Sequence, residues 1–157
     1  CINLQLESGQ VFAVDWYVIE LIKAYLRVGN IEQASSIAER THHNNLQNKI
    51  QASTCFVKKA LATCYYAQDQ QLTPRVVQLL QEALEYAQQQ KARFFELDIL
   101  LYHAQLQQAH SSISPEIISQ LKELTQNLTG HPSWTQYHQA QQLVNAFETN
   151  HQRIFTA

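Results

Sequence analysis

Apolar residues recur along most of the chain at intervals of three and four residues, and short polar stretches separate one apolar series from the next. This spacing places the apolar side chains on one face of an α-helix. In the first series, Trp16, Ile19 and Ile22 share such a face. The pattern predicts seven helices, at about 15–28, 31–44, 48–68, 74–87, 92–109, 115–129 and 133–153.

Residues that favour helix ends stand between these series. Gly29 suits the left-handed conformation that ends a helix, and Asn30 with Gln33 forms a capping box for the next one. Thr-Pro at 73–74 and Ser-Pro at 114–115 each combine a cap with proline at the first helical position. The other predicted signals are the capping boxes Asn48–Gln51 and Ser133–Gln136 and the helix stop Gly130.

Two segments leave alternatives open. Residues 1–13 form a lead-in in which Ile2, Leu4 and Leu6 alternate with polar residues, as in a short strand or at the end of a preceding element. Residues 74–109 contain no glycine or proline after Pro74, so they fit one long helix or two. We favour two helices, because a single helix of this length is unusual in a globular domain.

The composition supports an all-α protein and excludes several functions. Only three glycines and three prolines occur in 157 residues, fewer than the turns of a sheet protein require. The formal net charge of −2 argues against binding of nucleic acid by this segment. No apolar run approaches the roughly 20 residues of a membrane span. We therefore expect no nucleic-acid or membrane partner.

The three cysteines favour a reducing cytoplasm over a disulfide framework. Cys55 and Cys64 are nine residues apart, on opposite faces of a helix, so they cannot easily form a bridge. The chain starts at Cys1 rather than at Met, which we interpret as a fragment of a longer protein. A mature lipoprotein also begins with cysteine, but Ile2-Asn3-Leu4 lacks the small flexible residues that usually follow.

Residues 18–41 resemble a tetratricopeptide repeat, a helix–turn–helix unit of about 34 residues that buries its apolar face by stacking on neighbours. The matching residues are Leu21, Tyr25, Gly29, Ile31, Ala34 and Ala38, and the second unit matches at Leu61, Ala62, Tyr65, Leu80, Ala83 and Leu84. Ile22 departs from the family, which prefers glycine or alanine at that position. The resemblance implies a right-handed α-solenoid, as a single domain over residues 14–153.

In style, the degenerate repeats are similar to the sensor solenoids of bacterial LuxR-type regulators of the maltose-activator kind. That resemblance implies a non-catalytic interaction or effector-sensing module of a larger bacterial regulatory protein in the cytoplasm, with a role in signalling or transcription regulation. The alternative is a scaffold or oligomerisation domain that self-associates through exposed helix faces. No catalytic motif is present, and we expect no enzyme activity and no cofactor.

The first helix of each tetratricopeptide pair lines the concave groove of such a solenoid. Carried over to this chain, the groove positions predict a partner-binding site made of aromatic and basic side chains: Trp16, Lys23, Arg27, Phe56, Lys59 and Tyr66. Aromatic platforms among cations suit an acidic peptide or a C-terminal carboxylate. In the alternative interpretation, which is the commoner outcome for such residues, the aromatics pack against helices and the cations are simply solvated.

Histidines and thiols offer weaker chemistry. His103 and His110, like His131 and His138, are seven residues apart and so about 10 Å apart along a helix, too far to share one metal ion. We therefore predict no metal site. The thiol of Cys55 lies near two lysines and could act as a redox sensor, but we favour buried, inert packing for Cys55 and Cys64.

Overall fold

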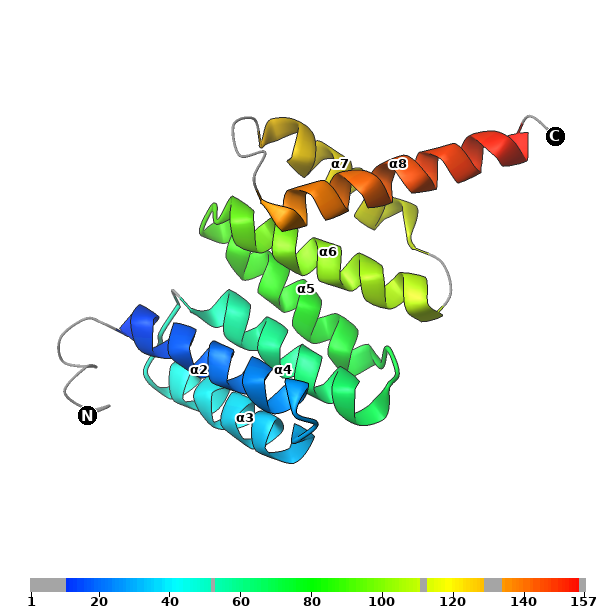
Figure 1. Cartoon of the computed structure of the whole chain (residues 1–157). Coiled ribbons are helices and arrows are strands. Elements are labelled where there is room, and N and C mark those ends of the chain that lie inside the picture. Colours follow the sequence, from blue (N-terminus) through cyan, green and yellow to red (C-terminus); the bar gives the residue numbers. More distant parts are fainter. Residues whose placement is uncertain (1–10, 52, 111–112, 129–133, 156–157) are drawn as a thin grey trace. The chain divides into compact units, whose positions relative to one another are not determined.

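The computed structural model describes residues 11–51, 53–110, 113–128 and 134–155, with side chains between residues 14 and 149. Within these ranges the chain forms seven α-helices and no strand, which confirms the predicted all-α class and helix number. The helices are α2 (Val11–Arg27), α3 (Ile31–Gln47), α4 (Thr54–Asp69), α5 (Pro74–Gln89), α6 (Arg93–His110), α7 (Pro115–Asn127) and α8 (Thr135–Phe155) (Figure 1).

Most of the predicted helix ends form as the sequence indicates. Gly29 adopts a φ of 77°, which ends α2 in the left-handed region that glycine tolerates. The Asn30 side chain then accepts a hydrogen bond from the backbone N–H of Gln33 at 3.2 Å. Thr73 accepts from the N–H of Val76, and Ser114 caps α7 in the same way. These caps satisfy backbone donors that would otherwise lack partners.

Three predicted boundaries are wrong. The first helix begins at Val11 rather than at 15, and α3 continues to Gln47 rather than ending at 44. Asn48 does not start a helix; it ends α3, and its side chain donates to the backbone oxygen of Asn44 at 2.9 Å. The predicted Asn48–Gln51 capping box is therefore absent, and α4 begins at Thr54. The signals at Ser133 and Gly130, and the alternation within residues 1–10, lie outside the described residues.

Residues 74–109 form two helices, as preferred from the sequence. The break lies at Gln90, which caps α5, and at Lys91, whose φ of 55° is left-handed. Lys91 therefore takes the conformation that glycine usually supplies at a helix end, at some cost in backbone energy. Lys49 does the same after α3, with a φ of 53°.

The chain divides into two compact units, one up to Gln90 and the other from Lys91. In the first unit, α2 packs on α3, α3 on α4 and α4 on α5, and α2 also contacts α4. Small side chains lie at the centre of these contacts, because Ala34, Ala38 and Ala62 are fully buried and let the helix backbones approach. Larger core residues, including Ile22 and Leu80, are also buried, and each contributes about 1.5–3 kcal/mol by leaving water.

A buried polar cluster joins three helices of this unit. The Asp15 carboxylate of α2 accepts hydrogen bonds from the Asn45 amide of α3, at 3.1 Å, and from the hydroxyl of Ser53, the residue before α4. All three side chains are buried. Because burying a carboxylate without partners is costly, these bonds fix the start of α4 relative to α2 and α3.

In the second unit, α6, α7 and α8 each pack on the other two. Phe94 at the start of α6 meets Trp134 edge to face, with ring centroids 5.1 Å apart. Lys122 of α7 forms an exposed ion pair with Glu148 of α8 at 2.6 Å. In the part of the chain that the structure describes, no helix is long and apolar enough to cross a bilayer. The solenoid arrangement and the single domain over residues 14–153 stay predictions.

Candidate functional site

Three of the predicted binding residues come together on α2 and α4. The Trp16 ring meets the Phe56 ring edge on, with centroids 6.4 Å apart and planes 75° apart. The Lys23 ammonium lies 5.9 Å from the centre of the Trp16 ring, within the range of a cation–π contact. We call Trp16, Lys23 and Phe56 the Trp16 cluster. It is an aromatic platform with a cation at its border.

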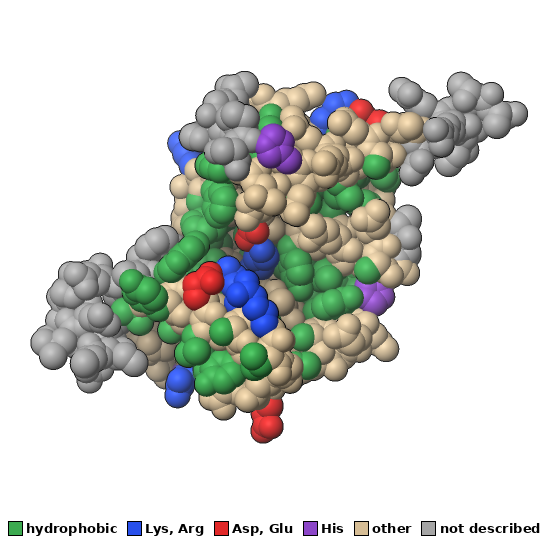
Figure 2. Space-filling view, viewed as in Figure 1, with side chains coloured by type: hydrophobic (Ala, Val, Ile, Leu, Met, Phe, Trp, Pro, Cys, Tyr) green, Lys and Arg blue, Asp and Glu red, His purple; other side chains and the backbone are tan. Residues whose placement is uncertain are grey.

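Burial distinguishes the roles of the two aromatic residues. Phe56 is almost completely buried, whereas Trp16 keeps 42% of its surface exposed. Phe56 is thus a core residue that packs against the Trp16 ring, and Trp16 is the side chain that another molecule could contact. Figure 2 shows hydrophobic and basic side chains side by side over α2. The alternative interpretation therefore describes Phe56 well and Trp16 only in part.

The basic residues of α2 differ in their surroundings. Lys23 forms an ion pair with Glu20, one turn earlier, at 2.7 Å, and both side chains are about half exposed. Such exposed pairs contribute little stability and exchange easily with other partners. Arg27 is exposed in the last turn of α2, where a cation is also favoured by the helix dipole. A partner with carboxylates would therefore meet Lys23 and Arg27 one helical turn apart.

Lys59 and Tyr66, the other predicted site residues, lie on α4 and are half-buried. They follow Phe56 by three and ten residues, which keeps them on the same side of the helix. Each makes an interaction of its own. The described contacts join Trp16 to Phe56 and to Lys23. Lys59 and Tyr66 lie farther along α4 and are not part of these contacts.

A second candidate site, which the sequence analysis did not find, is a pocket of about 470 Å³ within the first unit. Helix α4 lies between α3 and α5 and packs on both. We call this the α3–α5 pocket, and its lining is mostly polar: Glu39, His42, Leu61, Tyr65, Arg75, Gln78, Leu79 and Glu82.

Charged groups are paired at two places in or beside this pocket, and Lys58 is the one member of these pairs that does not line it. The Arg75 guanidinium lies 3.7 Å from the centre of the Tyr65 ring and donates to the Tyr65 hydroxyl, which in turn donates to Glu39 at 2.8 Å. The almost buried Lys58 ammonium donates to Glu82, which also accepts from Gln78. Each carboxylate thus accepts a hydrogen bond from α4, Arg75 donates to α4, and Lys58 of α4 donates to α5.

These contacts shift the pKa values of the pocket residues. The hydrogen bond from Lys58 lowers the pKa of Glu82, although burial opposes the shift. Burial and the positive charge of Lys58 lower the pKa of His42 from its ordinary value of 6.5, so its imidazole is neutral at pH 7. Burial, and then the bond to Glu39, raise the pKa of Tyr65 to about 12. The charged residues of the lining are Arg75, Glu39 and Glu82, and Glu82 is paired with Lys58 beside the pocket.

The α3–α5 pocket gave no signal in the sequence because its residues are spread over three helices. Glu39 and His42 are one turn apart on α3, as are Arg75 and Gln78 on α5. Taken alone, each such pair has the spacing of an ordinary solvated helix face. Only the packing of α3 and α5 on α4 shows that these faces meet.

The cysteines and histidines give no support to redox or metal chemistry. Burial raises the pKa values of Cys55 and Cys64 to about 11, and both are buried, free thiols. This confirms that they are packing residues. Among the described residues, no group of three or more histidine, cysteine or acidic side chains could hold a metal ion. His131 and Cys1 lie outside the described residues.

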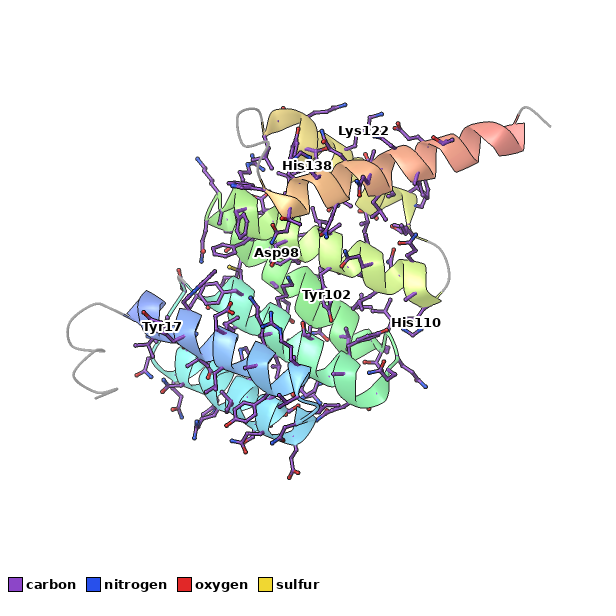
Figure 3. All side chains as sticks on the ribbon, viewed as in Figure 1. Tyr17, Asp98, Tyr102, His110, Lys122 and His138 are labelled. Carbon is purple, nitrogen blue, oxygen red and sulfur yellow. The ribbon has the colours of Figure 1, made fainter. Side chains whose placement is uncertain are left out.

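The outer side of α2 and α3 exposes apolar surface. Tyr17, which projects from α2 in Figure 3, is 74% exposed, and Leu21, one turn later, is 45% exposed. A groove of about 620 Å³ lies beside them, lined by Val14, Asp15, Val18, Leu21, Ile37, Arg40, Thr41, His43, Asn44 and Gln47. We call it the α2–α3 groove. Exposed apolar side chains beside a groove are a feature of many protein contacts.

Comparison of this chain with protein-family models, with curated proteins and with solved structures found no match.

Proposed function

We propose that this chain is a non-catalytic, tetratricopeptide-like interaction module of a bacterial cytoplasmic regulator, and that it binds an acidic peptide segment of a partner protein at the Trp16 cluster. The observation that carries the proposal is the partial exposure of Trp16. The Trp16 ring packs against the buried Phe56, yet Trp16 keeps 42% of its surface exposed. A tryptophan held in this way needs little ordering on binding, and tryptophan is among the residues that dominate binding energy at interfaces.

The charge around Trp16 supports an acidic ligand. Lys23 lies against the Trp16 ring and Arg27 follows one turn later, whereas Glu20 is already paired with Lys23. A carboxylate of the partner would replace Glu20 as the ion partner of Lys23. Alternatively, it would pair with Arg27 and leave the Lys23–Glu20 pair in place. Because surface pairs exchange at little cost, the intramolecular pair is no barrier to such binding.

The proposal is tested with peptides selected by display on the folded chain. Lys23→Ala with Arg27→Ala removes both cations of the surface, and the matched control Arg40→Ala with Lys49→Asn removes two exposed cations elsewhere in the same unit. Asparagine is chosen at Lys49 because it tolerates the left-handed φ of that position. We expect the first pair to weaken peptide binding at least about tenfold, which corresponds to about 1.4 kcal/mol, and the control to leave it unchanged. Equal binding by both variants would refute the proposal.

A second function, self-association as a scaffold, is favoured by the exposed apolar side chains on the outer side of α2 and α3. Tyr17 and Leu21 are the exposed apolar residues of α2 at the α2–α3 groove, and elsewhere in the first unit Val28, just after α2, is 77% exposed and Leu46 of α3 is 57% exposed. Light scattering over a concentration series tests this function. A dimer that dissociates on Leu21→Ser but not on Trp16→Ala would assign the α2–α3 groove to assembly. A dimer that dissociates on Trp16→Ala would replace peptide binding by the scaffold function.

A further inference from the structure

The α3–α5 pocket has the geometry of a small-molecule site separate from the Trp16 cluster. Its volume of about 470 Å³ falls within the range usual for ligand pockets. Its polar groups come from three helices, of which α3 and α5 each pack on α4, so their positions are set by helix packing and not by a loop. Rigid elements of this kind hold binding groups in place before the ligand arrives.

The charges of the pocket select the kind of ligand. Among the lining residues, Arg75 is a cation bonded through Tyr65 to Glu39, and Glu82 is a carboxylate already paired with Lys58, which does not line the pocket. The neutral His42 adds no charge. A simple anion would be attracted by Arg75 and repelled by the carboxylates, whereas a simple cation would be attracted by Glu39 and repelled by Arg75. A ligand that carries one charge of each sign satisfies both kinds of group. The pocket therefore favours a zwitterion.

The hydrogen-bonding capacity of the pocket agrees with this selection. The guanidinium of Arg75 has five N–H donors in a planar fork, and its described hydrogen bond to Tyr65 uses one nitrogen. Glu39 accepts the Tyr65 hydroxyl at one of its two carboxylate oxygens. A carboxylate can thus be bound at Arg75 and an ammonium group at Glu39, close to each other because both residues contact the same tyrosine.

The remaining surface of the pocket defines the rest of the ligand. Leu61 of α4 and Leu79 of α5 are the apolar residues of the lining. They offer a short apolar contact next to the charged groups. We infer that the α3–α5 pocket binds a free amino acid with an aliphatic side chain, whose carboxylate meets Arg75, whose ammonium group meets Glu39 and whose side chain lies against Leu61 and Leu79.

Three related compounds test this inference by titration calorimetry on the full chain. L-Leucine carries both charges, 4-methylpentanoate lacks the ammonium group, and 3-methylbutylamine lacks the carboxylate. We expect leucine to bind and each of the other two to bind at least about tenfold more weakly, because each leaves one charged group of the pocket without its partner. Equal affinity for all three compounds, or no binding of leucine at 10 mM, a concentration roughly at the weak end of measurable affinities, would overturn the inference.

Two variants locate the binding in the pocket. Glu39→Gln removes the negative charge but keeps an acceptor for Tyr65, and Arg75→Gln removes the guanidinium. The control Glu85→Gln removes an exposed carboxylate of the same helix α5 that does not line the pocket. We expect both pocket variants to weaken leucine binding at least about tenfold and the control to retain it. If Arg75→Gln loses its helical circular dichroism, it is unfolded and Glu39→Gln alone decides the test. Unchanged affinity for leucine in the folded Glu39→Gln variant would contradict the inference.

The result is independent of the peptide-binding proposal. Trp16 and Lys23 do not line the pocket, so Trp16→Ala and Lys23→Ala should leave leucine affinity unchanged. Loss of leucine binding in these two variants would show that the amino acid binds at the Trp16 cluster, and would overturn the pocket assignment while leaving that cluster as a binding surface.

Discussion

The ion pair between Lys58 and Glu82 shows how one buried charge depends on its partner. The Lys58 side chain is 9% exposed and that of Glu82 is 34% exposed, so the ammonium is the group with less access to water. Removal of the carboxylate leaves a buried ammonium without its partner. Removal of the lysine leaves a carboxylate that water can reach. The two single substitutions therefore differ in their effect.

We predict that Glu82→Ala lowers the free energy of unfolding by about 1–3 kcal/mol, less than the value for a fully buried pair because Glu82 is partly solvated. Lys58→Met should cost less, because the methionine side chain fills the same space without a charge. Urea denaturation of both variants measures the difference. A larger loss for Lys58→Met than for Glu82→Ala would contradict this account of the pair.

The lowered pKa of His42 makes stability depend on pH. In the folded protein, burial and the charge of Lys58 keep the pKa of His42 below its ordinary value of 6.5. The unfolded chain therefore binds a proton at His42 at a higher pH than the folded chain does. As the pH falls below about 6.5, the unfolded state is therefore favoured, and the free energy of unfolding decreases. His103, whose pKa is also lowered by burial, acts in the same direction.

We predict that His42→Gln reduces this loss of stability between pH 7.5 and pH 5. Urea denaturation at several pH values in this range gives the slope. The exposed neighbour His43 provides the control as His43→Gln. If the parent and His42→Gln lose stability in parallel, His42 is not the group that titrates.

At the scale of elements, α5 depends on the cap that starts it. Thr73 accepts a hydrogen bond from the N–H of Val76 at 3.4 Å, and Pro74 occupies the first helical position. Loss of a side-chain cap typically costs about 1 kcal/mol. We therefore predict that Thr73→Ala destabilises the protein by about 1 kcal/mol, whereas Thr73→Ser, which keeps the hydroxyl, has a small effect. Thermal denaturation of the two variants tests this, and equal melting temperatures would exclude a role for the cap.

Caps and apolar spacing made the seven helices predictable, because both are local properties of the chain. The Asn48–Gln51 signal failed because asparagine also favours helix C-termini, and Asn48 bonds back to Asn44. The break near Lys91 could be inferred from the length of residues 74–109. Its position could not be read from a glycine, because a lysine adopts the left-handed conformation there.

The candidate sites differ in how far the sequence could show them. Trp16 and Lys23 are seven residues apart, which is about two helical turns, and could be assigned to one face of α2 from the sequence alone. The repeat resemblance placed Trp16 and Phe56 in one predicted groove; their rings are in contact, whereas the groove itself stays a prediction. The α3–α5 pocket, by contrast, joins residues that are up to 43 positions apart, from Glu39 to Glu82, and depends on how helices pack.

At the scale of the whole molecule, the first compact unit contains its own network of contacts. Its four helices pack mainly on their neighbours in sequence, and α2 also contacts α4. In repeat proteins, stability comes from such interfaces between adjacent elements. A chain that ends at Gln90 retains every one of these interfaces.

We predict that residues 1–90 fold on their own, with helical circular dichroism and one cooperative urea transition. Leu80→Ala in this shorter chain should lower the free energy of unfolding by about 2–5 kcal/mol, because Leu80 is fully buried. Helicity that is lost in the shorter chain, or a transition without cooperativity, would show that the first unit depends on the second.

The central claim is that Trp16 is the residue that a partner covers. The chain has two tryptophans, so a Trp134→Phe variant makes Trp16 the sole tryptophan reporter. We would follow its fluorescence and its quenching by acrylamide while adding a display-selected acidic peptide. The account predicts a saturable shift to shorter wavelength and protection from quenching. Binding that is seen by calorimetry but leaves Trp16 equally quenched would contradict the account, because the partner would then be bound elsewhere.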